Sequence, residues 1–173
     1  REKEELIKRL KRLIDELRRV VKTLLADLER LLKEHHDRSR RILEESKRSL
    51  EELEKTLRRS DERVIEELLK RHHDLNRRLL EEDRELLRRL TEMIDRILEE
   101  LERLLKELDD EVKKLDKDDE LRKLKEELED LARKARKEIE DIKEKLRRNH
   151  ERVKKALEDL NRTAEELLDR ARQ

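Results

Sequence analysis

The sequence predicts an all-α protein: a long up-down-up three-helix bundle, coiled-coil-like, with helices of about 55 residues. Three observations lead to this prediction. First, the 173 residues include no Gly, Pro, Cys, Phe, Tyr or Trp, although natural chains average about 7% Gly and about 5% Pro. Second, 58% of the residues are charged and 32% are hydrophobic, and the hydrophobic ones recur with a helical period that a disordered chain lacks. Third, two short polar segments divide this pattern into three parts of similar length.

The two polar segments predict where the helices begin and end. Ser60 or Asp61 is suited to cap the start of the second helix, and Asp118 is suited to cap the third, because a short polar side chain accepts a hydrogen bond from a free backbone N–H there. Near-equal helices are what an up-down-up bundle needs. The predicted helices cover about residues 2–58, 61–115 and 119–173, in a single bundle domain of residues 1–173.

A rival break lies at residues 36–39, where Asp37 or Ser39 could cap a helix. The hydrophobic period continues across this segment from Leu31 to Ile42, whereas a turn would normally reset its phase. A break there would also leave helices of unequal length. We therefore expect the first helix to continue through it.

Polar residues occupy core positions where the period would place Leu. If the helices alternate in direction, His35 lies near the level of Asp83, and Ser46 lies near the level of His73. All five histidines and all three asparagines fall into two such groups, with Ser49 close to one of them. We expect a buried polar network of His35, Ser39, Ser46, His72, His73, Asn76, Asp83, Asn149, His150 and Asn161.

Buried polar layers have a physical use in a bundle lined with Leu. Leu layers resemble one another, so the helices could slip along their axes. A buried polar group without its partner costs about 1–3 kcal/mol, which penalises the slipped arrangements. Adjacent histidines point about 100° apart on a helix, so only one of each pair, His35-His36 and His72-His73, needs to be inside.

Other functions of these residues are weighed against the network. Histidine binds zinc, copper and nickel, but no HExxH motif or i,i+4 histidine pair is present, and we predict no metal site and no cofactor. A solvated surface pair is the other alternative for the histidines. Ser46, His73 and a carboxylate would need an oxyanion hole, which a helix interior without free backbone amides does not supply. We therefore expect no enzyme activity.

The charge balance restricts the partners. Lys plus Arg and Asp plus Glu are 50 each, giving a formal net charge of zero. A nucleic-acid surface or an anionic-membrane helix needs a basic excess, so neither partner is expected. No apolar run approaches the roughly 18 residues of a membrane span, and no signal peptide is recognisable. We expect no natural localisation, and a soluble, cytoplasmic chain in an expression host.

The hydrophobic stripe is wider on the first two helices than on the third, because apolar doublets such as Leu13-Ile14 and Met93-Ile94 recur there. The expected core includes Val64 and Leu104 on the second helix and Ala171 on the third. A wide stripe could receive a further helix or a second copy, although Lys and Arg stems can cover its edges. We expect a monomer and leave self-association or a designed helical partner as the alternative.

With Ser, His and Asn at core positions of long Leu-rich helices, the chain resembles de novo designed helical bundles with buried hydrogen-bond networks. This resemblance implies a structural scaffold without natural biochemical activity, whose polar layers specify helix register and topology. The alternative is a component of a designed oligomer or heteromeric helical assembly, with a pH response through the buried histidines. Natural three-helix repeats such as spectrin are less similar, because they usually carry aromatic residues.

Overall fold

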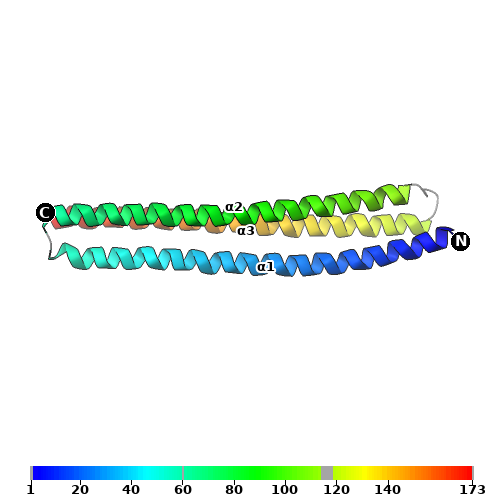
Figure 1. The fold of residues 1–173 in the computed structure, drawn as a ribbon, viewed down its shortest axis with the longest axis horizontal. Helices are drawn as coiled ribbons and strands as arrows, with labels where there is room; N and C mark the ends of the chain where they lie inside the picture. The colour runs from blue at the N-terminus through cyan, green and yellow to red at the C-terminus, as the bar shows by residue number, and fades with distance from the viewer. Residues whose placement is uncertain (1, 60, 114–118, 173) are drawn as a thin grey trace. The chain divides into compact units, whose positions relative to one another are not determined.

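The computed structural model describes residues 2–59, 61–113 and 119–172. These residues form three long helices and no strand (Figure 1), so the predicted all-α three-helix class is confirmed. Each helix has acidic side chains in its first turn and basic side chains in its last. These charges interact favourably with the positive N-terminal and negative C-terminal ends of the helix dipole. The helices are α1 (Glu2–Leu57, 56 residues), α2 (Glu62–Lys113, 52 residues) and α3 (Asp119–Arg172, 54 residues).

Hydrogen bonds at the described residues on either side of position 60 mark the end of α1 and the start of α2. The backbone N–H of Arg59 donates to the carbonyl of Thr56 at 3.0 Å as α1 ends. Asp61 Oδ1 then accepts the backbone N–H of Val64 at 3.2 Å, which is the bond an N-cap makes to the third helical residue. The predicted cap at Asp61 is therefore present. Ser60, the alternative cap of α2, and Asp118, the predicted cap of α3, lie outside the described residues. The rival break at residues 36–39 is absent, because α1 runs through them without interruption.

The contacts of the chain fall into two compact units. Unit 1 comprises residues 1–31 and 90–144, and unit 2 comprises residues 32–89 and 145–173. Each unit contains a segment of all three helices. The prediction that residues 1–173 form a single domain stays a prediction.

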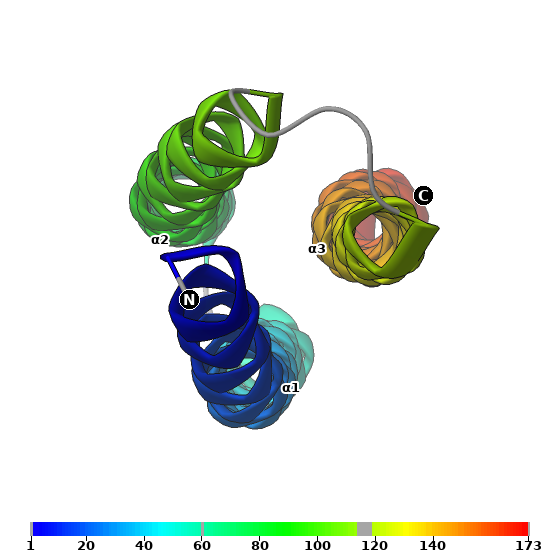
Figure 2. The ribbon, with the colours of Figure 1, turned by 90° about the vertical axis from the view of Figure 1, so that its right-hand side faces the viewer.

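Unit 1 has an aliphatic core, and Figure 2 shows the three helices end-on. Ion pairs between α1 and α3 in this unit show the relative direction of the two helices. Lys11 pairs with Glu120 at 3.1 Å and Arg18 with Glu127 at 3.5 Å, so the residue numbers of α1 and α3 rise together. The described buried side chains of unit 1 are all aliphatic. None of the described helices is long and apolar enough to cross a membrane.

The expected core is wrong at three positions. Val64 is 40% exposed and Leu104 is 38% exposed, while Ile65 and Leu105 are buried in their place. Ala171 is exposed as well. Both members of an apolar doublet lie close to the core, so a small rotation of the helix decides which of them is buried. The sequence period does not fix that rotation.

Candidate functional site

The buried polar side chains that the structure describes all lie in unit 2. They come from all three helices, and no more than 7% of any of them is exposed. Buried polar groups are stable only when hydrogen-bonded, so their partners determine what the site can do. The eight residues are His35, Ser39, Ser46, His72, Asn76, Asp83, Asn149 and His150.

The first group is centred on Asp83 of α2. Its Oδ1 accepts the hydroxyl of Ser39 at 2.6 Å, and its Oδ2 lies 2.6 Å from Nδ1 of His150. Asn149 Nδ2 donates to Ser39 Oγ at 3.1 Å and lies 2.8 Å from Nδ1 of His35. Every one of these bonds joins two different helices. We call this group the Asp83 network: His35, Ser39, Asp83, Asn149 and His150.

The bonds of the Asp83 network define the roles of its ring nitrogens. An amide nitrogen carries only donors, so Nδ1 of His35 accepts from Asn149, and the proton of the neutral ring is on Nε2. A carboxylate only accepts, so Nδ1 of His150 donates to Asp83. The remaining Nε2–H of His35 is buried without a hydrogen-bond partner. It lies 3.7 Å from Asp83 Oδ1, which is beyond hydrogen-bond distance.

The second group is centred on Asn76 of α2. The hydroxyl of Ser46 donates to Asn76 Oδ1. Asn76 Nδ2 donates to Asn161 Oδ1 at 2.5 Å and lies 3.3 Å from Nε2 of His72, which must therefore accept. Nδ1 of His72 lies 2.9 Å from Ser49 Oγ. We call this group the Asn76 network: Ser46, Ser49, His72, Asn76 and Asn161.

Helical spacing assembles both networks. His72 and Asn76 are four residues apart on α2, as are His35 and Ser39 on α1, so each pair shares one helix face. Between the two networks lies an aliphatic layer in which Leu79 is 1% exposed. Leu79 is one turn from both central residues, Asn76 and Asp83, and packs in a layer with Ile42, Val153 and Leu157.

Burial sets the protonation of His35. Loss of hydration lowers the pKa of His35 below its ordinary value and is the largest cause. The carboxylate of Asp83 opposes this effect, and the nearby rings of His150 and His36 add to it. Because burial prevails, His35 is neutral at pH 7, and its contact with Asp83 is not an ion pair.

Burial acts on His72 in the same direction. Loss of hydration lowers the pKa of His72, the adjacent His73 lowers it further, and a hydrogen bond with the backbone of Leu160 raises it. His72 is therefore neutral at pH 7 as well. Each network thus contains a neutral, buried histidine that accepts a hydrogen bond from an asparagine amide.

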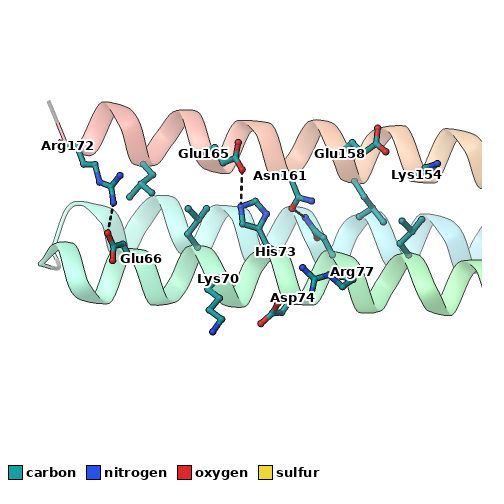
Figure 3. Close-up of a pocket in the computed structure, with 15 residues that line it drawn as sticks. Glu66, Lys70, His73, Asp74, Arg77, Lys154, Glu158, Asn161, Glu165 and Arg172 are labelled. Atoms are coloured by element: carbon teal, nitrogen blue, oxygen red, sulfur yellow. Dashed lines mark hydrogen bonds and ion pairs between the residues drawn. The ribbon is translucent and has the colours of Figure 1, made fainter.

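One predicted residue, His73, lies outside both networks. It is 26% exposed in a groove of about 740 Å³ between α2 and α3 (Figure 3). Its Nε2 is 3.5 Å from Oε1 of Glu165, and Arg172 pairs with Glu66 at 2.6 Å farther along the same groove. Both contacts bridge α2 and α3, so the groove lies between two packed helices. Of the two adjacent pairs, His35 and His72 are the buried members.

Asn161 and Ser49 are at the edges of the Asn76 network. Asn161 is half-buried and lines the groove beside His73 (Figure 3). Ser49 was outside the predicted set, yet it is bonded to His72. Its position one turn after Ser46, on the same face of α1, is the sequence signal that could have included it.

Within residues 2–59, 61–113 and 119–172, no group of three or more His, Cys, Asp or Glu side chains is placed to hold a metal ion. The Ser49–His72 contact resembles a nucleophile beside a base, but both residues lie within helices whose backbone amides are bonded internally. An oxyanion needs free donors, and α1 and α2 supply none at this position.

Comparison with known proteins adds one structural likeness. No protein-family model matches the chain, and no curated protein matches it. A solved structure described as "Computationally designed three helix bundle" is 24% identical over 97% of this chain and 85% of the other, with a TM-score of 0.38.

Proposed function

We propose that this chain is a designed structural scaffold without catalytic activity, in which the Asp83 and Asn76 networks fix the register and topology of the helices. The observation that carries the proposal is that the bonds of the Asp83 network all cross between helices. The same holds for three bonds of the Asn76 network, from Ser46, Ser49 and Asn161. Polar residues that bonded only to their own helix or to water would make no bonds between helices.

The energetic argument follows from those crossing bonds. Ser39 and Ser46 are one heptad apart on α1, and their partners are one heptad apart on α2. Sliding α1 by one heptad against α2 would bring one serine to the central residue of the other network, but the second serine and one of the two central residues would then face leucines. Each buried donor or acceptor left without a partner costs about 1–3 kcal/mol, whereas a Leu layer moved onto another Leu layer costs little. The networks therefore penalise slipped registers more than they stabilise the native one.

Disulfide trapping tests this proposal, because the chain has no Cys of its own. His73→Cys with Glu165→Cys reports the native register, because these two side chains face each other across α2 and α3, with Nε2 and Oε1 3.5 Å apart. His73→Cys with Arg172→Cys reports a slip of one heptad along α3. Each pair is placed in the parent chain and in a chain whose networks are replaced by aliphatic residues. That chain carries His35→Leu, Ser39→Ala, Ser46→Ala, Ser49→Ala, His72→Leu, Asn76→Leu, Asp83→Leu, Asn149→Leu, His150→Leu and Asn161→Leu.

The proposal expects the native pair to crosslink in both chains and the slipped pair to crosslink only in the aliphatic chain. Circular dichroism checks that both chains remain helical. If the slipped pair stays reduced in the aliphatic chain under the same oxidant, the networks do not set the register and the proposal is wrong.

A second candidate function is a component of a helical assembly. Large apolar side chains are exposed on unit 1: Val20 at 57% and Met93 at 45%. Single exposed apolar side chains are common on monomeric proteins, so their exposure does not distinguish a monomer from an assembly. The molecular mass in solution does. Light scattering at rising concentration should give 21.4 kDa for a scaffold that acts alone. A larger mass that Met93→Glu returns to 21.4 kDa would favour the assembly instead.

A further inference from the structure

The titratable groups near neutral pH are confined to one part of the chain. All five histidines belong to unit 2, and the sequence of unit 1 contains none. Histidine is the side chain whose ordinary pKa lies between pH 5 and 8. The core of unit 1 is aliphatic, whereas the core of unit 2 contains the two networks. The two units should therefore respond differently to mild acid.

Each network depends on one unprotonated ring nitrogen. Nδ1 of His35 accepts an N–H of Asn149, and Nε2 of His72 accepts an N–H of Asn76. In both cases the donor is an asparagine amide whose other N–H is bonded elsewhere in the network. A proton added to either ring would occupy this nitrogen and set an N–H against an N–H.

We propose that unit 2 contains an acid-sensitive lock, in which protonation of His35 and His72 breaks both networks and opens unit 2 while unit 1 stays folded. This inference goes beyond the scaffold function, since a scaffold needs only the networks and not their response to pH. It concerns opening of the helices within unit 2, measured against unit 1 of the same molecule.

The charges around the two rings determine the direction of the response. His35 of α1 faces Asp83 from α2 and His150 from α3, with His36 next to it on α1. Asp83 already accepts from Ser39 and from His150, so both of its oxygens are engaged before His35 gains a proton.

His72 has no carboxylate partner in its network. It faces the hydroxyl of Ser49 from α1 and the backbone of Leu160 from α3, with His73 beside it on α2. A proton on His72 would therefore be a buried charge with only neutral partners, which is costly.

An amide flip does not relieve the clash at His35. Turning Asn149 would present Oδ1 to the protonated ring. The same turn would place that oxygen against Ser39 Oγ, whose own proton is donated to Asp83. Two acceptors would then face each other in a site closed to water. Relieving this contact would take the Ser39 hydroxyl away from Asp83, so the flip restores one bond of the network only by breaking another.

The experiment is hydrogen exchange with mass spectrometry on the full chain at pH 7.5, 6.5, 5.5 and 5.0, corrected for the intrinsic rate at each pH. Below the ordinary histidine pKa, each proton bound only by the open state raises the opening constant about tenfold per pH unit. With two histidines, protection in unit 2 should fall by up to about 100-fold per pH unit. Protection in unit 1 should change by less than about threefold.

Matched variants assign the response. His35→Asn keeps an acceptor toward Asn149 and His72→Gln keeps one toward Asn76, and neither titrates. The double variant should lose the acid-induced opening of unit 2, while the control His36→Gln, at an exposed position, should keep it. If the double variant does not fold at pH 7.5, each single variant should lose about half of the pH slope.

Three results would overturn the proposal. Protection could fall equally in both units, or unit 2 could gain protection in acid because protonated His35 pairs with Asp83, or His36→Gln could remove the response. The first and third results would place the effect of pH outside the two buried rings, and the second would show that protonation of His35 tightens unit 2 and does not open it.

Discussion

His35 Nε2 and Asp83 Oδ1 lie 3.7 Å apart, both buried, without a hydrogen bond between them. The distance is about 0.5 Å too long for a bond, so the N–H of His35 is desolvated with only a weak attraction to the carboxylate. The carboxylate itself is satisfied by Ser39 and His150. Both carboxylate oxygens of Asp83 therefore have a hydrogen-bond donor, whereas the Nε2–H of His35 has no acceptor.

Removing the acid should be strongly destabilising. Asp83→Leu leaves the Ser39 hydroxyl and the His150 N–H buried without an acceptor, and we expect a loss of about 3–5 kcal/mol in the free energy of unfolding. Urea unfolding followed by circular dichroism at pH 7.5 measures it. The variant with all five residues of the Asp83 network replaced by aliphatic ones is the comparison. It should match or exceed the parent, and if it unfolds as easily as Asp83→Leu, the loss does not come from unpaired polar groups.

Stability should fall with acidity in a defined direction. The pKa values of His35 and His72 are lowered in the folded protein, so their contribution is complete above the unfolded value of about 6.5. It is lost as pH falls from there toward the folded values. The free energy of unfolding should be nearly level from pH 8 to about 7 and should decline below about pH 6.5 by up to about 1.4 kcal/mol per pH unit for each histidine. Urea midpoints across this range check it, and a free energy that rises on acidification would contradict the sign.

The aliphatic layer of unit 2 should be sensitive to cavities. Leu79→Ala removes a side chain that is 1% exposed between the two networks, and we expect a loss of about 3–5 kcal/mol. Leu104→Ala at a position that is 38% exposed is the control and should cost less than about 1 kcal/mol. Thermal and urea unfolding compare them. Equal losses at the two positions would mean that Leu79 is not the packed residue that the structure describes.

The cap of α2 should contribute a modest and separable amount. Asp61→Ala removes the acceptor of the Val64 N–H and should cost about 1 kcal/mol, whereas Asp61→Asn keeps an acceptor and should cost a few tenths. A Tm difference between the two variants measures the cap. If both lose the same amount, the charge of Asp61 matters and its hydrogen bond does not.

The sequence was sufficient for the helices and placed the polar residues to within about one turn of the helix, since Ser46 was expected level with His73 and is bonded to Asn76. The period fixes which face of a helix is apolar, and two connections of similar spacing fix the antiparallel levels that bring Ser39 to Asp83. It was not sufficient for the choice between Val64 and Ile65 or between His35 and His36. Neighbours in a doublet differ by one step of the helix, and the final rotation depends on how three side-chain surfaces interdigitate.

The bonding pattern also lay beyond the sequence. His72 and His73 are neighbours on α2 near its buried face, yet only His72 is hydrogen-bonded to Asn76. Which nitrogen of a ring accepts depends on distances of a few tenths of an ångström. Such distances follow from packing, and residue spacing does not predict them.

The layer of Leu79 has a consequence for how variants combine. It separates two sets of polar groups that share no bond, so substitutions in one set should add to substitutions in the other within about 0.5 kcal/mol. Within either set, by contrast, double-mutant cycles should give large coupling energies, because Asp83 and Asn76 each serve several partners. Unit 2 should therefore tolerate replacement of all residues of one network together while the other network is unchanged, whereas replacing part of a network should be destabilising.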